Sequence, residues 1–153
     1  MAYPAPLQEL IELFEYLPEA ERRESLINYA DASKSCGPKE GEVFDLEDVR
    51  KDEECTDTVG VFLRAEEGDR AHFAIELGPK VQTLTKAMTA ILCRSLNGAP
   101  MKEVLEVPAD FVPRIIGAEL VRLRSQTVYY VLSRMKTAVK MLLDQRRAAE
   151  GGG

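Results

Sequence analysis

The hydrophobic period changes twice along this chain, and this change constrains the fold more than any other feature. Residues 59–78 contain two β-prone runs joined by Glu-Glu-Gly-Asp, as in a β-hairpin. Apolar residues before and after this region repeat with the period of an α-helix. The order of helices, hairpin and helices indicates an α+β domain. In such a domain, helices from both chain ends pack on one face of a small antiparallel sheet.

Helical periodicity extends over four long segments: residues 6–17, 18–33, 81–96 and 125–142. Pro18 ends the first and can open the second, and Asn97-Gly98 is expected to end the third with a left-handed residue. The second helix is expected to bury Leu26, Ile27 and Ala30. Shorter helical pieces bracketed by prolines are predicted over 100–107 and 108–119.

Residues 33–54 lose this periodicity among glycine, proline and charged residues, which predicts a long surface loop leading into the hairpin. In the second arm of the hairpin, one face carries Ala71, Phe73, Ile75 and Leu77. The opposite face carries Arg70, His72, Ala74 and Glu76 and is expected to face solvent. His72 is therefore interpreted as a surface residue rather than a ligand or base.

The length of the chain indicates the number of domains, and its charge indicates which partners are excluded. A chain of 153 residues suits one domain, 1–153, which can bury a core without disulfides or metals. The net charge of −6 and the pI near 5.0 argue against a nucleic-acid partner. The chain lacks an apolar run of about 18 residues and begins without a basic, signal-like segment. We therefore expect no membrane association and a cytoplasmic location.

Three cysteines, Cys36, Cys55 and Cys93, cannot all pair, and they lack the spacing of a zinc site. Cys55 stands between the long loop and the first hairpin strand, where a thiol can reach a partner. The alternative is a half-buried cysteine acting as a small hydrophobe. Cys93 lies in an apolar helix and is expected to serve packing. Cys36 is expected to be exposed in the loop, where it can resolve an oxidised Cys55.

Acidic residues flank Cys55 on both sides: Asp52, Glu53, Glu54 and Asp57. Negative neighbours disfavour a second negative charge, so these carboxylates are expected to keep the thiol protonated. Because the thiolate is the reactive species, activation of Cys55 has to come from elsewhere.

The segment ECTDTVGVFL, residues 54–63, resembles the signature of the SufE family of sulfur-acceptor proteins. Three further blocks are similar to the family in order and spacing: SLINYA, LTKAMTAILCRSLNG and PMKEVLEVPADFV. Residues 114–136 resemble the family's closing motif, with Arg124 on its arginine. The resemblance covers about residues 7–143 and leaves 144–153 as a flexible tail.

This resemblance implies the fold shared by SufE and the IscU-like scaffold proteins. It implies that Cys55 takes a persulfide sulfur from a SufS-like cysteine desulfurase and passes it to a SufB-like iron–sulfur scaffold. Arg124 would favour the thiolate or the persulfide anion; otherwise it is a solvated arginine at a helix start. No cofactor is expected on this chain, because pyridoxal phosphate belongs to the desulfurase. The protein would be a carrier and activator rather than an independent enzyme.

Two other functions remain open from the sequence. The first is an iron–sulfur scaffold that uses Cys36, Cys55 and Cys93 as cluster ligands. Such ligands must converge, and the apolar helix around Cys93 disfavours this. The second is a noncatalytic binding module that keeps the fold and has lost the sulfur role.

Overall fold

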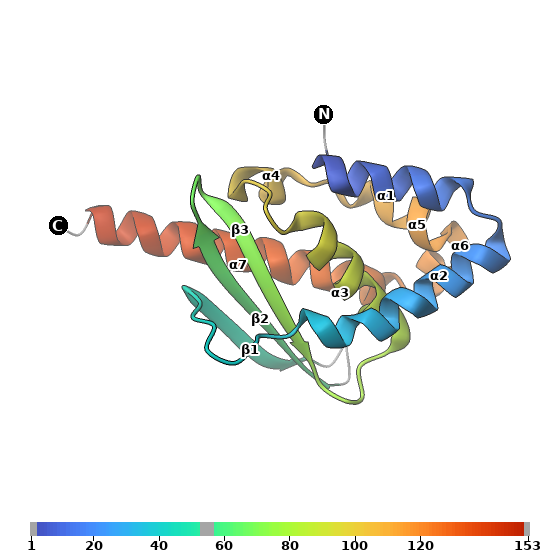
Figure 1. Ribbon diagram of the computed structural model, residues 1–153, viewed down its shortest axis with the longest axis horizontal. Helices are drawn as coiled ribbons and strands as arrows, with labels where there is room; N and C mark the ends of the chain where they lie inside the picture. Colours follow the sequence, from blue (N-terminus) through green and yellow to red (C-terminus); the bar gives the residue numbers. More distant parts are fainter. Residues whose placement is uncertain (1–2, 53–56, 152–153) are drawn as a thin grey trace.

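The structure is a computed structural model that describes residues 3–52 and 57–151. In this part of the chain, helices pack on one side of a three-stranded antiparallel sheet (Figure 1). The elements follow in the order α1 Ala5–Tyr16, α2 Glu19–Ala32, the 3₁₀ helix η1 Ser33–Cys36, β1 Leu46–Asp52, β2 Asp57–Glu66, β3 Arg70–Leu77, α3 Thr83–Leu96, α4 Met101–Glu106, the 3₁₀ helix η2 Ala109–Phe111, α5 Val112–Ile116, α6 Ala118–Leu123 and α7 Ser125–Gly151. This arrangement confirms the predicted α+β class.

The sheet has the strand order β1-β2-β3, and the predicted hairpin is its β2–β3 pair. Residues 67–69 form its turn, where Gly68 has φ 82° and Asp69 has φ 56°. Glycine adopts this left-handed backbone without steric cost, which explains its place in the turn.

Strand β1 corrects the prediction of an uninterrupted loop over residues 33–54. The sequence LEDVRKD contains two apolar side chains, Leu46 and Val49, so no strand pattern is visible in it. In the structure, β1 pairs along β2 from Leu46↔Leu63 to Asp52↔Asp57. Hydrogen bonding to β2 therefore determines the extended conformation of β1, and the β-propensity of its own residues does not.

The core lies between one face of the sheet and the two longest central helices. The inner sheet face presents fully or nearly fully buried side chains: Val59, Val61, Leu63, Ala71, Phe73 and Ile75. Helices α3 and α7 pack against the sheet and against each other, and α1 and α2 pack on α3. In Figure 1, α7 crosses behind the sheet and its C-terminal part extends beyond it.

The predicted long helices are confirmed, and the bounds of α1, α2 and α3 are shifted by one or two residues. The piece predicted over 108–119 is divided into η2, α5 and α6, and α6 continues to Leu123. The residue with positive φ after α3 is Gly98, at 88°. The prediction that Ile27 is buried is wrong: its side chain is 51% exposed, because α2 turns Leu26 and Ala30 towards the core instead. Helix α7 continues to Gly151 through most of the expected tail, and Arg146 in this stretch donates a 3.1 Å hydrogen bond to Asp69.

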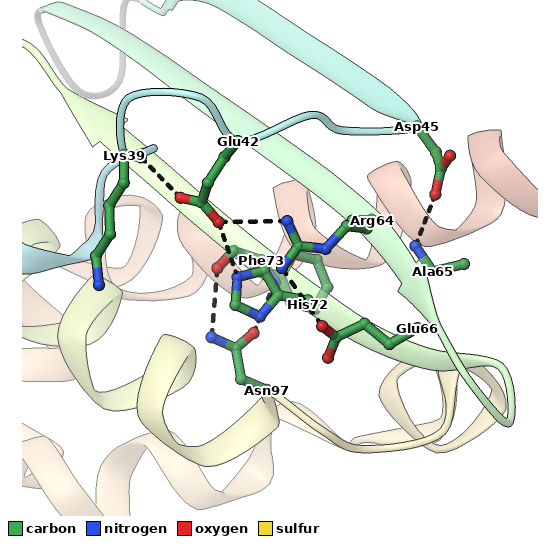
Figure 2. A network of polar contacts seen from close by, with 9 residues as sticks. All are labelled: Lys39, Glu42, Asp45, Arg64, Ala65, Glu66, His72, Phe73 and Asn97. Atoms are coloured by element: carbon green, nitrogen blue, oxygen red, sulfur yellow. Dashed lines mark hydrogen bonds and ion pairs between the residues drawn. The ribbon is translucent and has the colours of Figure 1, made fainter.

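The opposite face of β3 is less solvated than predicted. Ala74 is buried and His72 is half-buried. Residues 37–45 cross this side of the molecule, where Phe44 stacks on the His72 ring. Glu42 lies 3.6 Å from Nε2 of His72 (Figure 2). Among the described residues, no helix is both long and apolar enough to cross a membrane.

Candidate functional site

The end of the β1–β2 pair is the part of the sheet nearest in sequence to the predicted reactive cysteine. The last register pair is Asp52↔Asp57, so the chain leaves β1 and returns into β2 at adjacent positions. Cys55 belongs to residues 53–56, which lie outside the described residues. The described geometry is therefore that of the two strand ends on either side of Cys55.

Asp57 anchors the start of β2. Its carboxylate accepts hydrogen bonds from the backbone amides of Thr58 at 2.7 Å and Lys80 at 2.6 Å. The amide of Gly78 also donates to the carbonyl of Thr58, at 2.9 Å. Hydrogen bonds from the Lys80 and Thr58 amides lower the pKa of Asp57. The Asp57 carboxylate thus links the start of β2 to Lys80, in the segment that follows β3.

Arg134 binds the backbone of both β1 and β2. Its side chain is 4% exposed and extends from α7. The guanidinium donates to the carbonyl of Asp48 on β1 at 2.7 Å and to that of Val59 on β2 at 3.0 Å. It also lies 3.4 Å from the Asp48 carboxylate and donates to Tyr130 Oη at 2.5 Å. One buried cation therefore ties α7 to both strands, at Asp48 in β1 and at Val59 near the start of β2.

Tyr130 also borders a shallow depression of about 360 Å³ on the N-terminal half of α7. Its other lining residues are polar or aromatic: Ser125, Gln126, Tyr129 and Ser133. Hydroxyl groups in such a depression can donate to or accept from a docked polypeptide. The depression therefore shares a residue with the Arg134 network that holds β1 and β2.

Arg124 lies between α6 and α7, and its side chain is exposed. Its backbone carbonyl accepts a 3.0 Å hydrogen bond from the amide of Val128 in the first turn of α7. Within residues 3–52 and 57–151, its guanidinium forms no hydrogen bond or ion pair. The position at a helix start agrees with the sequence, while its predicted role towards Cys55 stays a prediction.

The other two cysteines both belong to the described residues and lie close to each other. Cys93 is buried in α3, 5% exposed, as predicted. The prediction of an exposed loop position for Cys36 is wrong: this residue ends η1, is half-buried, and packs on the core. The reason is that η1 continues directly from α2 and contacts α3. The Cys36 and Cys93 thiols interact with each other, and Cys36 Sγ also donates a long hydrogen bond to the Ala32 carbonyl, at 3.9 Å.

Two residues of the site, Arg134 and Asp57, are structural anchors that the sequence reasoning missed. Arg134 stands inside the apolar stripe of the last helix, beside Val131 and Met135, and a lone charge there is a signal of a buried ion pair. The sequence presents Asp57 only as one of four charges around Cys55. No sequence pattern indicates that its carboxylate binds the amide of Lys80, because 23 residues separate the two.

Solved structures with the same fold include two relevant cases. A solution structure of a hypothetical protein from Thermus thermophilus matches with a TM-score of 0.69 and 26% identity, covering 94% of this chain and 99% of that one. A crystal structure of the N-terminal part of a nitrogen-fixing NifU-like protein from Brucella abortus matches with a TM-score of 0.55 and 15% identity, covering 78% and 92%. The second likeness shows the fold alone. No curated protein matches this chain.

The fold is thus of the SufE and NifU-like class, as the sequence predicted. Residues 8–139 match the SufE model, described as an Fe-S metabolism associated domain. Because this match spans most of the chain, the protein belongs to the SufE family. Its role is in iron–sulfur metabolism.

Proposed function

We propose that the protein is a sulfur acceptor that takes the outer sulfur of a persulfide from a cysteine desulfurase onto Cys55. It then passes this sulfur to an iron–sulfur scaffold. The desulfurase carries the pyridoxal phosphate, so this chain supplies only the accepting thiol and its surroundings. Family membership supports the class of reaction, and the position of Cys55 between two anchored strands supports the choice of residue.

The transfer is a thiol exchange. The Cys55 thiolate attacks the outer sulfur of the desulfurase persulfide, forming a new S–S bond. The S–S bond within the donor persulfide breaks, and the donor cysteine leaves as a thiolate. Cys55 then carries the persulfide, and no net oxidation takes place. The step needs a thiolate and an accessible approach, but neither a metal nor acyl chemistry.

The observation behind this proposal is that both strands flanking residues 53–56 are held by partners outside the sheet, β1 at Asp48 and β2 at Asp57 and Val59. Asp57 is held by the Lys80 amide, and Arg134 binds β1 and β2 together. A reactive group mounted between rigid supports is placed reproducibly for a partner. Acidic charge beside Cys55 would keep the resting thiol protonated, which leaves activation to the desulfurase complex or to Arg124.

The burial of Cys93 supports an acceptor over an iron–sulfur scaffold. Cluster ligands need to converge on one open site, whereas Cys93 lies in the core on α3 and is hydrogen-bonded to Cys36. Anaerobic incubation with iron and sulfide tests this directly. Cluster absorption stoichiometric with protein would favour the scaffold function instead.

The acceptor function is tested by the turnover of the desulfurase. An acceptor removes the persulfide sulfur and frees the donor cysteine, so alanine formation from cysteine should accelerate when this protein is added. The Cys55→Ser variant should give no acceleration, and Cys36→Ser should behave like the wild type. Equal stimulation by wild type and Cys55→Ser would contradict the proposal.

A further inference from the structure

Two thiols meet on the side of the molecule lined by η1, α3 and β3. Cys36 comes from η1 and Cys93 from α3, so the fold joins positions far apart in the chain. Both line a cavity of about 340 Å³ whose walls also include His72, Phe73 and Asn97. The two thiols interact with each other. Two interacting cysteines that line one cavity form a candidate dithiol site among the described residues.

The walls of this cavity are well ordered by hydrogen bonds. The Asn97 side chain accepts from the Phe73 amide at 2.6 Å and donates to the Phe73 carbonyl at 3.3 Å, which fixes β3 to the end of α3. Glu42 bridges Arg64, at 3.3 Å, and the half-buried His72 (Figure 2). These contacts hold the segment after Cys36 against the sheet, so the relative position of the two thiols is set by the fold.

The two thiols differ in exposure and in acidity. Cys36 is half-buried and faces the cavity, whereas Cys93 is 5% exposed. The hydrogen bond from Cys93 lowers the pKa of Cys36, and that bond together with burial raises the pKa of Cys93 well above its usual range. Cys36 is therefore the thiol that ionises and reacts first, and Cys93 is placed to react with it in turn.

A small oxidant fits the space in front of Cys36. A water molecule in the liquid occupies about 30 Å³, so the cavity of about 340 Å³ accommodates hydrogen peroxide or a small organic hydroperoxide. Both thiols line the cavity, but Cys36 is half-buried whereas Cys93 is 5% exposed, so Cys36 is the more accessible of the two to such a molecule. Oxidation of a thiol follows its exposure and its thiolate character.

We propose that Cys36 and Cys93 form a redox-active dithiol that a hydroperoxide converts into an intramolecular disulfide, without participation of Cys55. The Cys36 thiolate attacks one peroxide oxygen, the O–O bond breaks, and an alcohol or water leaves after protonation. Cys36 is then a sulfenic acid. The Cys93 sulfur attacks the Cys36 sulfur, the S–O bond breaks, and the Cys93 proton leaves with the hydroxyl group as water. The two thiols lose two electrons and the peroxide gains them.

This disulfide would link η1 to α3 and so fix the start of the connection between α2 and β1. That connection contains Glu42 and leads into β1, one of the two strands next to Cys55. Oxidation therefore acts on a segment that ends at the proposed acceptor site. The chemistry itself is independent of the proposed function, because it uses neither Cys55 nor a desulfurase.

The test uses the full-length Cys55→Ser variant, reduced and then treated anaerobically with one equivalent of hydrogen peroxide. When the protein is then denatured in the presence of N-ethylmaleimide, it should take up no label. Its mass should have fallen by about 2 Da, two hydrogen atoms. Trypsin should release residues 35–39 joined to residues 87–94, the peptides that contain Cys36 and Cys93. Dithiothreitol should separate them and restore two labelling sites.

Matched variants assign the roles of the two thiols. With Cys93→Ala added, Cys36 should stop at a sulfenic acid that dimedone captures. With Cys36→Ser added, Cys93 should stay unoxidised at the same peroxide dose. The proposal is overturned if the Cys55→Ser protein accumulates Cys36 sulfinic acid with a free Cys93, or if both thiols survive. A wild-type product linked mainly through Cys36 and Cys55 would also overturn it.

Discussion

Arg134 on α7 donates a 2.7 Å hydrogen bond to the backbone carbonyl of Asp48 on β1. The same guanidinium nitrogen donates to Val59 on β2, so the two strands that flank residues 53–56 share one buried donor. Without this donor, only the pairing between β1 and β2 would hold these two strands in position. In this protein, the longest helix also contributes to their position.

Replacing Arg134 with methionine should therefore destabilise the protein strongly. The Asp48 and Val59 carbonyls would lose a donor, and the Asp48 carboxylate, 14% exposed, would lose its buried counter-ion. We expect the free energy of unfolding in urea to fall by about 3 kcal/mol. The control is Arg146→Met, whose ion pair with Asp69 is exposed and should contribute about 0.5 kcal/mol or less. Equal effects of the two substitutions would contradict the anchoring role of Arg134.

Asp57→Asn should weaken the start of β2 in a pH-dependent way. Because the folded protein lowers the pKa of Asp57 below its usual 3.8, ionised Asp57 stabilises the fold above this pH. This contribution is lost as the pH falls through the lowered pKa. The stability difference between wild type and Asp57→Asn should therefore be largest near neutral pH and shrink in acid. Urea unfolding across this range measures it, and a difference independent of pH would exclude a charge effect.

Gly78→Ala offers an independent check on the same anchor. A Cβ atom at Gly78 would overlap the Asp57 carboxylate, which sits against the Gly78 backbone. The added methyl group should displace that carboxylate from the Lys80 amide and lower stability at neutral pH. In an Asp57→Ala background the same substitution should have a smaller effect. A full effect in both backgrounds would show that Asp57 is not the group displaced.

Cys93→Ala should lower stability modestly and leave sulfur acceptance intact. The side chain is a small buried group in α3, so its truncation should cost about 1 kcal/mol in urea unfolding. Cys36→Ser, at a half-buried position, provides the comparison and should cost less. Loss of acceptance in either folded variant would move the acceptor role away from Cys55.

The role of Arg124 can be measured through the reactivity of the Cys55 thiol. In a Cys36→Ser, Cys93→Ala background, alkylation by iodoacetamide as a function of pH reports on Cys55 alone. Arg124→Ala should raise the apparent pKa of this thiol, because removing a nearby cation disfavours the thiolate. Glu54→Gln should lower it, and the nearby exposed arginine Arg122, changed to alanine, should leave it unchanged. No change with Arg124→Ala would indicate that Arg124 does not act on the resting thiol.

The sequence predicted the helices and the hairpin well because their apolar residues are periodic over many positions. Val128, Leu132, Met135, Val139 and Leu142 are all buried along α7, as their spacing indicates. Strand β1 escaped prediction for the opposite reason. Its side chains LEDVRKD carry little apolar signal, and pairing with β2 determines its conformation.

The candidate site residues Cys55 and Arg124 follow from the resemblance of short sequence motifs to the family, and their roles stay predictions. The anchors Asp57 and Arg134 depend on contacts across the fold, with the Lys80 amide and with two strand carbonyls. The contact of Cys36 with Cys93 is of the same kind, since it arises from packing of η1 on α3. Pairings of this type need the tertiary structure.

Sulfur acceptance by Cys55 is tested most directly by the intact mass of the protein after incubation with a cysteine desulfurase and cysteine. We expect a gain of about 32 Da, one sulfur atom, that dithiothreitol removes. The gain should map to the peptide containing Cys55, persist in Cys36→Ser and Cys93→Ala, and vanish in Cys55→Ser. An adduct that remains in folded Cys55→Ser, or a wild-type protein without an adduct beside an active desulfurase, would contradict it.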